Sequence, residues 1–503
     1  FNINVYPTVS GLSITSANAT GTLRLDSAAK ITFDGRVNAT GSTKDLIIAN
    51  TVTTGYAINF VNDANNNTIK YCTIRSVNTS TTSGTITFTT GIAGGTGNDN
   101  NTIDNNDILD GATTPVNAIY SAGTSAAVDN SGNTVSNNNI ANFFSAASVT
   151  NGMLLTSTGN STWSVTSNRF YQGATRVYTT GNTHNVISIQ SGGGYTITGN
   201  TIGYANSGGT GSYNMIGNSV TLSGFPTSYT TTGTATTTRL IAINLAFTAG
   251  AAVSSIQNNT VAGIALFTSS GAGTTNGILC GINLTSGNAN IGTTTGNTIG
   301  ATSGNSALYA ACTSAGGAVV GIYATSTGTV TIQNNNIGAI DAVGTTSTLS
   351  GAFTGIDVAG TGGLFNISSN NIGNTTANNI RTGYLGATLG TGGSITTTTG
   401  STSPMVGIRH TATGAGVTIS SNTLRGWQNG TTGGGAVTGI TSSGSVTNFT
   451  TISSNALGTS GLGWMTWQFA NTSGTLTGIS ATGSSTADSL HLIDNNDFRG
   501  ITY

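Results

Sequence analysis

Four aspartates close together in the sequence are the residues best suited to chemistry: Asp99, Asp104, Asp107 and Asp110. Carboxylate oxygens are the usual ligands of Ca²⁺, and a pair of carboxyl groups can act as general acid and general base on a glycoside. Asp also replaces Asn in tight bends, because both side chains hydrogen-bond their own backbone. The structural interpretation is favoured, and weak Ca²⁺ binding is the functional role predicted for these four residues.

The other residue types that commonly carry out catalysis are scattered. His184, His410 and His491 show neither the spacing of a metal site nor a nucleophile partner. Arg169 and Arg176 are the nearest basic residues on later turns, and they are few for holding an acidic polymer. We therefore expect a non-enzymatic protein with no catalytic residues and no cofactor other than Ca²⁺.

Two tryptophans lie three residues apart, Trp464 and Trp467, in a segment that we expect to be a loop. An aromatic ring offers a large apolar face, so an exposed pair could contact a glycan, whereas a buried pair would pack the core of the loop. Packing is the favoured interpretation, and glycan contact is the alternative.

A seven-residue phrase that recurs along the chain must position these side chains. Its clearest copy is Ile332–Gly338, and its general form is an aliphatic residue, two small polar residues, Asn, one residue, then an aliphatic residue or Phe. This pattern predicts strand, bend, strand, with Asn at the bend because Asn tolerates a left-handed backbone. Cys72 replaces the Asn in one variant copy. The predicted ladder of stacked Asn residues comprises Asn106, Asn138, Asn168, Asn200, Asn259, Asn297, Asn335, Asn370, Asn422, Asn455 and Asn496.

Copies of the phrase recur roughly every 30 to 40 residues, which is the mark of a solenoid. A further Gly-Ile strand precedes each phrase, as at Gly321-Ile322, so each turn should contain three short strands separated by loops rich in Gly, Thr and Ser. We predict an all-β parallel β-helix. It forms a single solenoid over 1–503, with compact N-terminal turns in 1–55 and about twelve Asn-motif turns in 56–503.

Composition excludes several classes of protein. Only 5% of the residues are charged and the formal net charge is −1, which gives no electrostatic reason to bind nucleic acid. No apolar run approaches the roughly 18 residues that span a bilayer. Three cysteines form no disulfide framework, and a bridge between Cys280 and Cys312 is left open.

Several segments carry a resemblance to a known group of proteins. Ile31–Arg36, Gly41–Ile47, Ala57–Asn62 and Asn66–Ile74 resemble the β-helix repeat regions of large Bacteroidota surface and secreted proteins. More distantly, the predicted fold resembles that of pectate lyases and polygalacturonases. The resemblance implies a right-handed helix, export by the type IX system and surface display, but no particular activity.

The same resemblance implies O-glycosylation at Asp-Ser-aliphatic sites, which makes Ser27 and Ser489 candidates. The chain ends directly after a copy of the phrase, so we expect a segment of a longer protein or one that stacks on copies of itself.

The expected function is an extracellular structural or adhesive rod: a surface stalk, an adhesin segment or a filament subunit. The alternative is a β-helix that binds or degrades a surface polysaccharide. Ice binding through flat Thr-rich ladders is a third option, but it is weakened because no strict Thr-x-Thr face is seen to repeat in register.

Overall fold

A computed structural model describes residues 1–217, 235–269, 271, 276–345, 348–349, 351–384, 404–431, 434–467, 474–483 and 490–502. Across these residues the chain forms short β-strands and a single 3₁₀ turn, η1 (Val37–Ala39), without an α-helix. None of the helical structure in this part of the chain is long and apolar enough to cross a membrane.

The chain divides into two compact units. Unit 1 comprises Phe1–Ala174, Thr183–Thr210 and Asn244–Ser255, and unit 2 comprises Thr175–Asn182, Gly211–Ile243 and Ile256–Tyr503. The prediction of one solenoid over 1–503 stays a prediction.

Three sheets of 14, 14 and 13 strands account for most of the described structure, and we name them A, B and C. Sheet A contains β1 (Ile3–Val5), β4 (Ile31–Asp34), β7 (Thr68–Lys70), β10 (Thr102–Asp104), β14 (Thr134–Ser136), β18 (Ser164–Thr166), β22 (Thr196–Thr198), β26 (Ser254–Gln257), β30 (Ala289–Ile291), β34 (Thr329–Gln333), β38 (Thr361–Ser368), β42 (Thr413–Ser420), β46 (Val446–Ser453) and β50 (Leu490–Asp494).

Sheet B contains the strands that follow the bend of each turn: β2 (Leu12–Ser16), β5 (Leu46–Asn50), β8 (Cys72–Ser76), β11 (Asp107–Asp110), β15 (Asn139–Ala141), β19 (Arg169–Tyr171), β23 (Thr201–Ile202), β27 (Thr260–Val261), β31 (Thr298–Gly300), β35 (Asn336–Gly338), β39 (Asn371–Ile372), β43 (Thr423–Leu424), β47 (Ala456–Leu457) and β51 (Asp497–Phe498).

Sheet C contains β3 (Leu23–Asp26), β6 (Ile58–Val61), β9 (Ile86–Phe88), β12 (Asn117–Ser121), β16 (Thr150–Leu155), β21 (Thr183–Ile189), β25 (Arg239–Leu245), β29 (Leu279–Leu284), β33 (Ala318–Ala324), β37 (Ala352–Val358), β41 (Met405–His410), β45 (Val437–Ser442) and β49 (Leu476–Ala481). Each turn therefore contributes one strand to each sheet, and neighbouring strands are parallel. The predicted right-handed parallel β-helix is confirmed.

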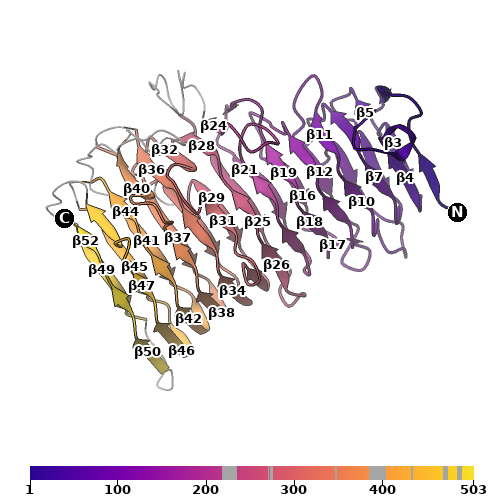
Figure 1. Ribbon diagram of the computed structural model, residues 1–503. Helices are drawn as coiled ribbons and strands as arrows, with labels where there is room; N and C mark the ends of the chain where they lie inside the picture. Colours follow the sequence, from indigo (N-terminus) through magenta and orange to yellow (C-terminus); the bar gives the residue numbers. More distant parts are fainter. Residues whose placement is uncertain are drawn as a thin grey trace. The chain divides into compact units, whose positions relative to one another are not determined.

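The phrase sets the register because its aliphatic residues point inward at the same place in every turn. In unit 1, Ile103 pairs with Ile69 on one side and Val135 on the other, and all three side chains are completely buried. Figure 1 shows β7 and β10, which carry Ile69 and Ile103, side by side. Each such buried side chain contributes roughly 1.5–3 kcal/mol to folding. A slip of one residue would turn the whole row outward.

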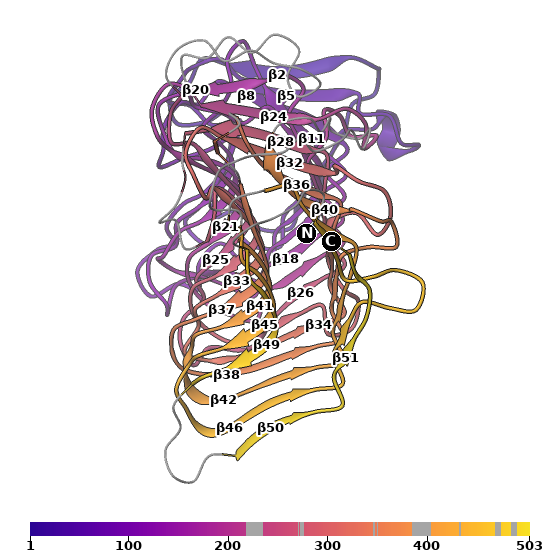
Figure 2. The ribbon, with the colours of Figure 1, turned by 90° about the vertical axis from the view of Figure 1, so that its left-hand side faces the viewer.

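A fourth sheet was not anticipated by the three-strand prediction. This nine-stranded sheet D lies entirely in unit 2. Figure 2 shows its strands β32, β36 and β40 following one another. The strands of sheet D are β20 (Arg176–Tyr178), β24 (Tyr213–Gly217), β28 (Ile264–Thr268), β32 (Leu308–Cys312), β36 (Ile340–Gly344), β40 (Ile380–Tyr384), β44 (Trp427–Asn429), β48 (Met465–Trp467) and β52 (Ile501–Thr502).

Sheet D occupies segments after the phrase that we expected to be loops. The signal was a short apolar run among Gly and Ser, as at Ile340–Gly344, and such a run does not distinguish a strand from a loop. A strand forms there because Ile340 pairs with Leu308 and Ile380 in the adjacent turns and is fully buried between them.

The bend of the phrase also differs from its predicted form. The left-handed residue is the one before the ladder Asn, as at Asn137 (φ 56°), Ser167 (φ 56°) and Asn334 (φ 58°), while the ladder Asn itself has negative φ. The prediction that the ladder Asn is chosen for backbone freedom is therefore wrong.

Candidate functional site

The ladder Asn residues act through their side chains. In unit 1 the Oδ1 atom of Asn138 accepts hydrogen bonds from the main-chain N–H of Asn106 at 2.8 Å and from its Nδ2 at 3.1 Å. Nδ2 of Asn138 in turn donates to Oδ1 of Asn168 at 3.0 Å and to the carbonyl oxygen of Ile103 at 2.9 Å. Asn138 is completely buried, so these bonds satisfy the main-chain N–H of Asn106 at the bend and give the carbonyl of Ile103 a side-chain partner.

The same bonds recur along both units. They link Asn106, Asn138, Asn168 and Asn200 in unit 1. In unit 2 they link Asn259, Asn297, Asn335, Asn370, Asn422, Asn455 and Asn496. Before the first of these, Cys72 cannot accept such bonds, but its main-chain N–H still donates to Asn106 Oδ1 at 2.9 Å.

A second ladder in unit 1 was missed by the sequence analysis. Nδ2 of Asn67 donates to Oδ1 of Asn101 at 2.9 Å, and Nδ2 of Asn101 donates to Oδ1 of Asn133 at 3.1 Å. The signal that could have found it is an Asn placed directly before a Thr-aliphatic pair in three successive turns, as at Asn101-Thr102-Ile103.

The four predicted Ca²⁺ ligands are not gathered around one point. Asp104 ends β10 of sheet A, whereas Asp107 and Asp110 begin and end β11 of sheet B, and Asp99 precedes β10. Within the part of the chain that the structure describes, no group of three or more His, Cys, Asp or Glu side chains could hold a metal ion. Calcium binding by these residues stays a prediction.

Each of these carboxylates bonds to a polar group of the adjacent turn. Asp99 accepts from the hydroxyl of Ser131 at 3.0 Å, and Asp104 accepts from the hydroxyl of Ser136 at 2.7 Å. Asp107 accepts from Nδ2 of Asn139 at 2.7 Å and pairs with Lys44, and Asp110 accepts from Nδ2 of Asn142 at 2.9 Å. These bonds connect neighbouring turns, which agrees with the structural interpretation that Asp replaces Asn at these positions.

A basic cluster of unit 1 is likewise paired. Nε and Nη2 of Arg36 donate to the two oxygens of buried Asp34 at 2.8 and 2.6 Å, and Lys70 lies 3.4 Å from the same carboxylate. Burial opposes ionisation of Asp34, but the bonds from Arg36 and the charges of Arg36 and Lys70 outweigh it, so its pKa lies below its usual value. The Arg36 guanidinium stacks 4.2 Å above the ring of Tyr71 and donates to the carbonyl of Gly41, which anchors the connection between β4 and β5.

The two tryptophans proposed for glycan contact are buried. Trp464 is 1% exposed and its ring lies 5.9 Å from that of Trp427 in an edge-to-face arrangement, while Trp467 is 3% exposed. Trp467 belongs to β48 of sheet D rather than to a loop. Neither ring offers a face to a sugar, because both side chains are almost completely buried.

The remaining candidates lie apart from one another. Cys72, Cys280 and Cys312 are buried and unbridged, and burial raises the pKa of Cys72 and Cys280 to about 12 and that of Cys312 to about 11, so their thiols are poor nucleophiles. Ser27 is exposed after β3, where a modification could reach it, and Ser489 lies outside the described residues.

Two rows of hydroxyls run in register across the outer face of sheet A in unit 1. Thr134–Ser136 pairs with Ser164–Thr166, which pairs with Thr196–Thr198, so the first and third residues of each strand align. The first row also includes Thr102, Thr68 and Thr32. Among these strands only Thr196–Thr198 has the strict Thr-x-Thr form, so the rows mix Thr with Ser and no strict Thr-x-Thr face repeats over these turns.

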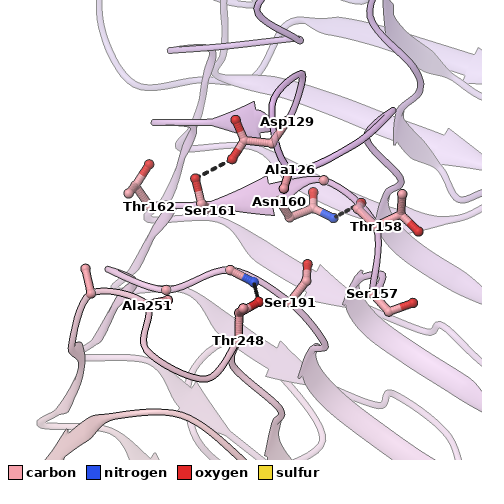
Figure 3. A pocket seen from close by; sticks show the side chains of 14 residues that line it. Ala126, Asp129, Ser157, Thr158, Asn160, Ser161, Thr162, Ser191, Thr248 and Ala251 are labelled. Atoms are coloured by element: carbon pink, nitrogen blue, oxygen red, sulfur yellow. Dashed lines mark hydrogen bonds between the residues drawn. The ribbon is translucent and has the colours of Figure 1, made fainter.

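A recess of about 440 Å³ opens in unit 1 at the corner between sheets C and A (Figure 3). Corner loops of four successive turns line it: Ala126 and Asp129, then Ser157–Thr162, then Ser191–Gly193, then Thr248, Ala251 and Ala252. Most of the lining side chains are small or carry hydroxyls, and Asp129 is the one charged residue among them. Sequence reasoning did not single out this group.

Comparison with known proteins adds little to this geometry. No family model matches the chain, and no curated protein matches it. A solved structure titled "Structure of PL6 family alginate lyase AlyGC" is similar with a TM-score of 0.18 at 10% sequence identity, over 99% of this chain and 96% of that chain. A similarity of this size carries no argument about function.

Proposed function

We propose that this chain is a structural, non-enzymatic β-helical segment of an extracellular protein, serving as a surface stalk, an adhesin segment or a filament subunit. The observation that carries the proposal is the buried Asn ladder, which repeats the same hydrogen bonds from turn to turn within each unit. The side chains of such a ladder bond neighbouring turns to each other, and they are not presented to solvent as reactive groups.

The state of the charged side chains supports the same proposal. Ion pairs in the described residues join Arg24–Asp26, Arg36–Asp34, Lys44–Asp107, Lys70–Asp34, Arg381–Asp341, Arg409–Asp357 and Arg499–Asp497. Asp341 and Arg381 are almost completely buried against each other, with Nε of Arg381 2.6 Å from the carboxylate. Seven of the thirteen Lys and Arg residues take part in these pairs, so their charge is compensated within the fold.

Polysaccharide recognition is the second candidate function. The aspartates that suggested a polysaccharide-degrading site are divided between two sheets and bonded to neighbouring turns, so they do not support it. The specific observation in favour of binding is the recess beside Asp129.

Electron microscopy of the native material at low concentration tests the structural proposal. We expect extended rods or continuous fibres, in which the β-helix is one segment among others. Compact isolated particles would contradict the proposal. Immunogold labelling of intact and permeabilised cells tests the extracellular location, and label that appears only after permeabilisation would contradict it.

A further inference from the structure

The recess beside Asp129 exists because three consecutive glycines at one corner of unit 1 have no side chains to fill it. Gly192, Gly193 and Gly194 follow one another there, and a Cβ atom on Gly192 would lie 1.9 Å from the carbonyl oxygen of Asn160. A Cβ atom on Gly193 would lie 2.6 Å from the carbonyl oxygen of Ala252. The corner loops of the preceding and following turns are longer. They form the walls of the recess, and the backbone of the three glycines forms its floor.

The walls of the recess are held by bonds within the protein. The main-chain N–H of Gly192 donates to the hydroxyl of Thr248 at 2.9 Å, and the hydroxyl of Ser191 donates to the carbonyl of Thr156 at 2.7 Å. Below the floor, the hydroxyl of Tyr195 donates to the carbonyl of Ser191 at 2.9 Å, and its ring stacks on Phe247. A recess fixed in this way loses little conformational entropy when a ligand binds.

The polar groups around the recess define the chemistry of its ligand. Oδ2 of Asp129 accepts a hydrogen bond from the hydroxyl of Ser161, and no protein group in the described part of the chain donates to Oδ1. Ser157 and Thr158 add exposed hydroxyls to the rim. Sugar hydroxyls can donate to a carboxylate and both donate to and accept from Ser and Thr hydroxyls.

The charge of the recess indicates which class of sugar it can bind. Asp129 is negative and no Lys or Arg lines the recess, so a uronate or sulfated sugar would be repelled. The volume lies in the range of small-ligand sites. We propose that this recess binds a neutral or amino sugar residue of a glycan, with Asp129 accepting hydrogen bonds from it. The inference rests on the proposed extracellular role only in that the recess must meet glycans.

Glycan binding by the whole chain tests the proposal. The probes are cellotriose, mannotriose and N,N′-diacetylchitobiose, with trigalacturonate as the acidic comparison, measured by titration calorimetry. We expect at least one neutral or amino oligosaccharide to bind and trigalacturonate not to bind. Absence of binding by all three neutral and amino probes at millimolar concentration would overturn the proposal, as would equal binding of trigalacturonate.

Two variants locate the site. Ser157→Trp places a bulky ring at the exposed rim and should abolish binding, whereas Thr54→Trp, at an exposed position of the same unit outside the recess, should leave it unchanged. Asp129→Asn should weaken binding of the neutral probe about tenfold, the weight of one charge-assisted hydrogen bond, and should reduce the exclusion of trigalacturonate. Thermal melts verify that each variant is folded.

Binding that survives Ser157→Trp would show that the sugar sits elsewhere and would overturn the proposal. Neither result bears on the rods seen by electron microscopy, so failure of this inference and failure of the structural proposal can be told apart.

Discussion

Asn138 Oδ1 lies 2.8 Å from the main-chain nitrogen of Asn106 and 3.1 Å from its Nδ2, so one oxygen of one turn holds two donors of the turn before it. Only an amide of this length can accept from one turn while donating to the next, because Asp lacks the donor and Gln would displace the oxygen. This relationship, rather than backbone strain, explains why Asn recurs at the fourth position of the phrase.

Replacing this amide should destabilise unit 1 strongly. In Asn138→Ala the main-chain N–H of Asn106 and the carbonyl of Ile103 lose buried partners, at about 1–3 kcal/mol each. We expect a loss of roughly 3–5 kcal/mol in the free energy of unfolding, measured by chemical denaturation. Thr134→Ala, an outward substitution in the same turn, is the control and should change stability by well under 1 kcal/mol. Equal effects of the two substitutions would contradict the ladder's importance.

Asp63 should hold a surface loop in place. Its two oxygens accept from the main-chain N–H groups of Ile92 at 3.2 Å, Thr96 at 3.3 Å and Gly97 at 3.1 Å. Since Ile92 is half exposed, Asp63→Ala should speed thermolysin cleavage in this loop severalfold. Mass spectrometry of the fragments identifies the site, and Asp26→Ala serves as a control on an exposed carboxylate. Unchanged cleavage would show that the loop is held by other contacts.

Stability should depend on pH through His410. This side chain is buried, with Nδ1 2.8 Å from the hydroxyl of Ser442, and burial lowers its pKa to about 4. The unfolded chain, with a His pKa near 6.5, takes up the proton first, so stability present above pH 6.5 is lost as the pH falls towards 4. We expect this loss to total roughly 3 kcal/mol.

The variant His410→Gln isolates that contribution, because it retains a polar group that cannot be protonated. Urea unfolding of both proteins at a series of pH values should give a smaller slope between pH 6.5 and 4 for the variant. Parallel curves would show that the histidine is already protonated in the folded chain or is exposed.

Trp464 should behave as a core residue. Its ring packs edge-to-face with Trp427, so Trp464→Ala should cost about 3–5 kcal/mol of unfolding free energy. Chemical denaturation measures this loss. A variant that keeps its stability but loses affinity for a glycan would instead support the alternative interpretation, in which this tryptophan contacts a glycan.

The hydroxyl rows of sheet A should be too short to hold the protein on ice. In the described turns of unit 1, hydroxyls occupy both rows over three successive turns, and Asp104 and Lys70 continue the second row with charged groups. We therefore expect the chain to stay in the liquid during ice-affinity partitioning. Uptake into the ice, abolished by Thr166→Lys, would contradict this expectation.

The sequence by itself determined the repeating core of this protein. The aliphatic positions of the phrase, such as Ile103 and Val135, and the position of each ladder Asn follow from local pattern, because alternation along a strand decides which side chains face inward. The three strands of each turn and their parallel stacking could be predicted for the same reason.

Only the tertiary structure decided what depends on alignment between turns. Turn lengths vary, so the residue that lies beside Ile340, or beside Asp104, is known only once strands pair. Sheet D, the burial of Trp464 and the separation of the aspartates all follow from that pairing. The recess requires four corners of unequal length, with Asp129 and Thr248 more than a hundred positions apart in the chain, and no local pattern specifies such a meeting.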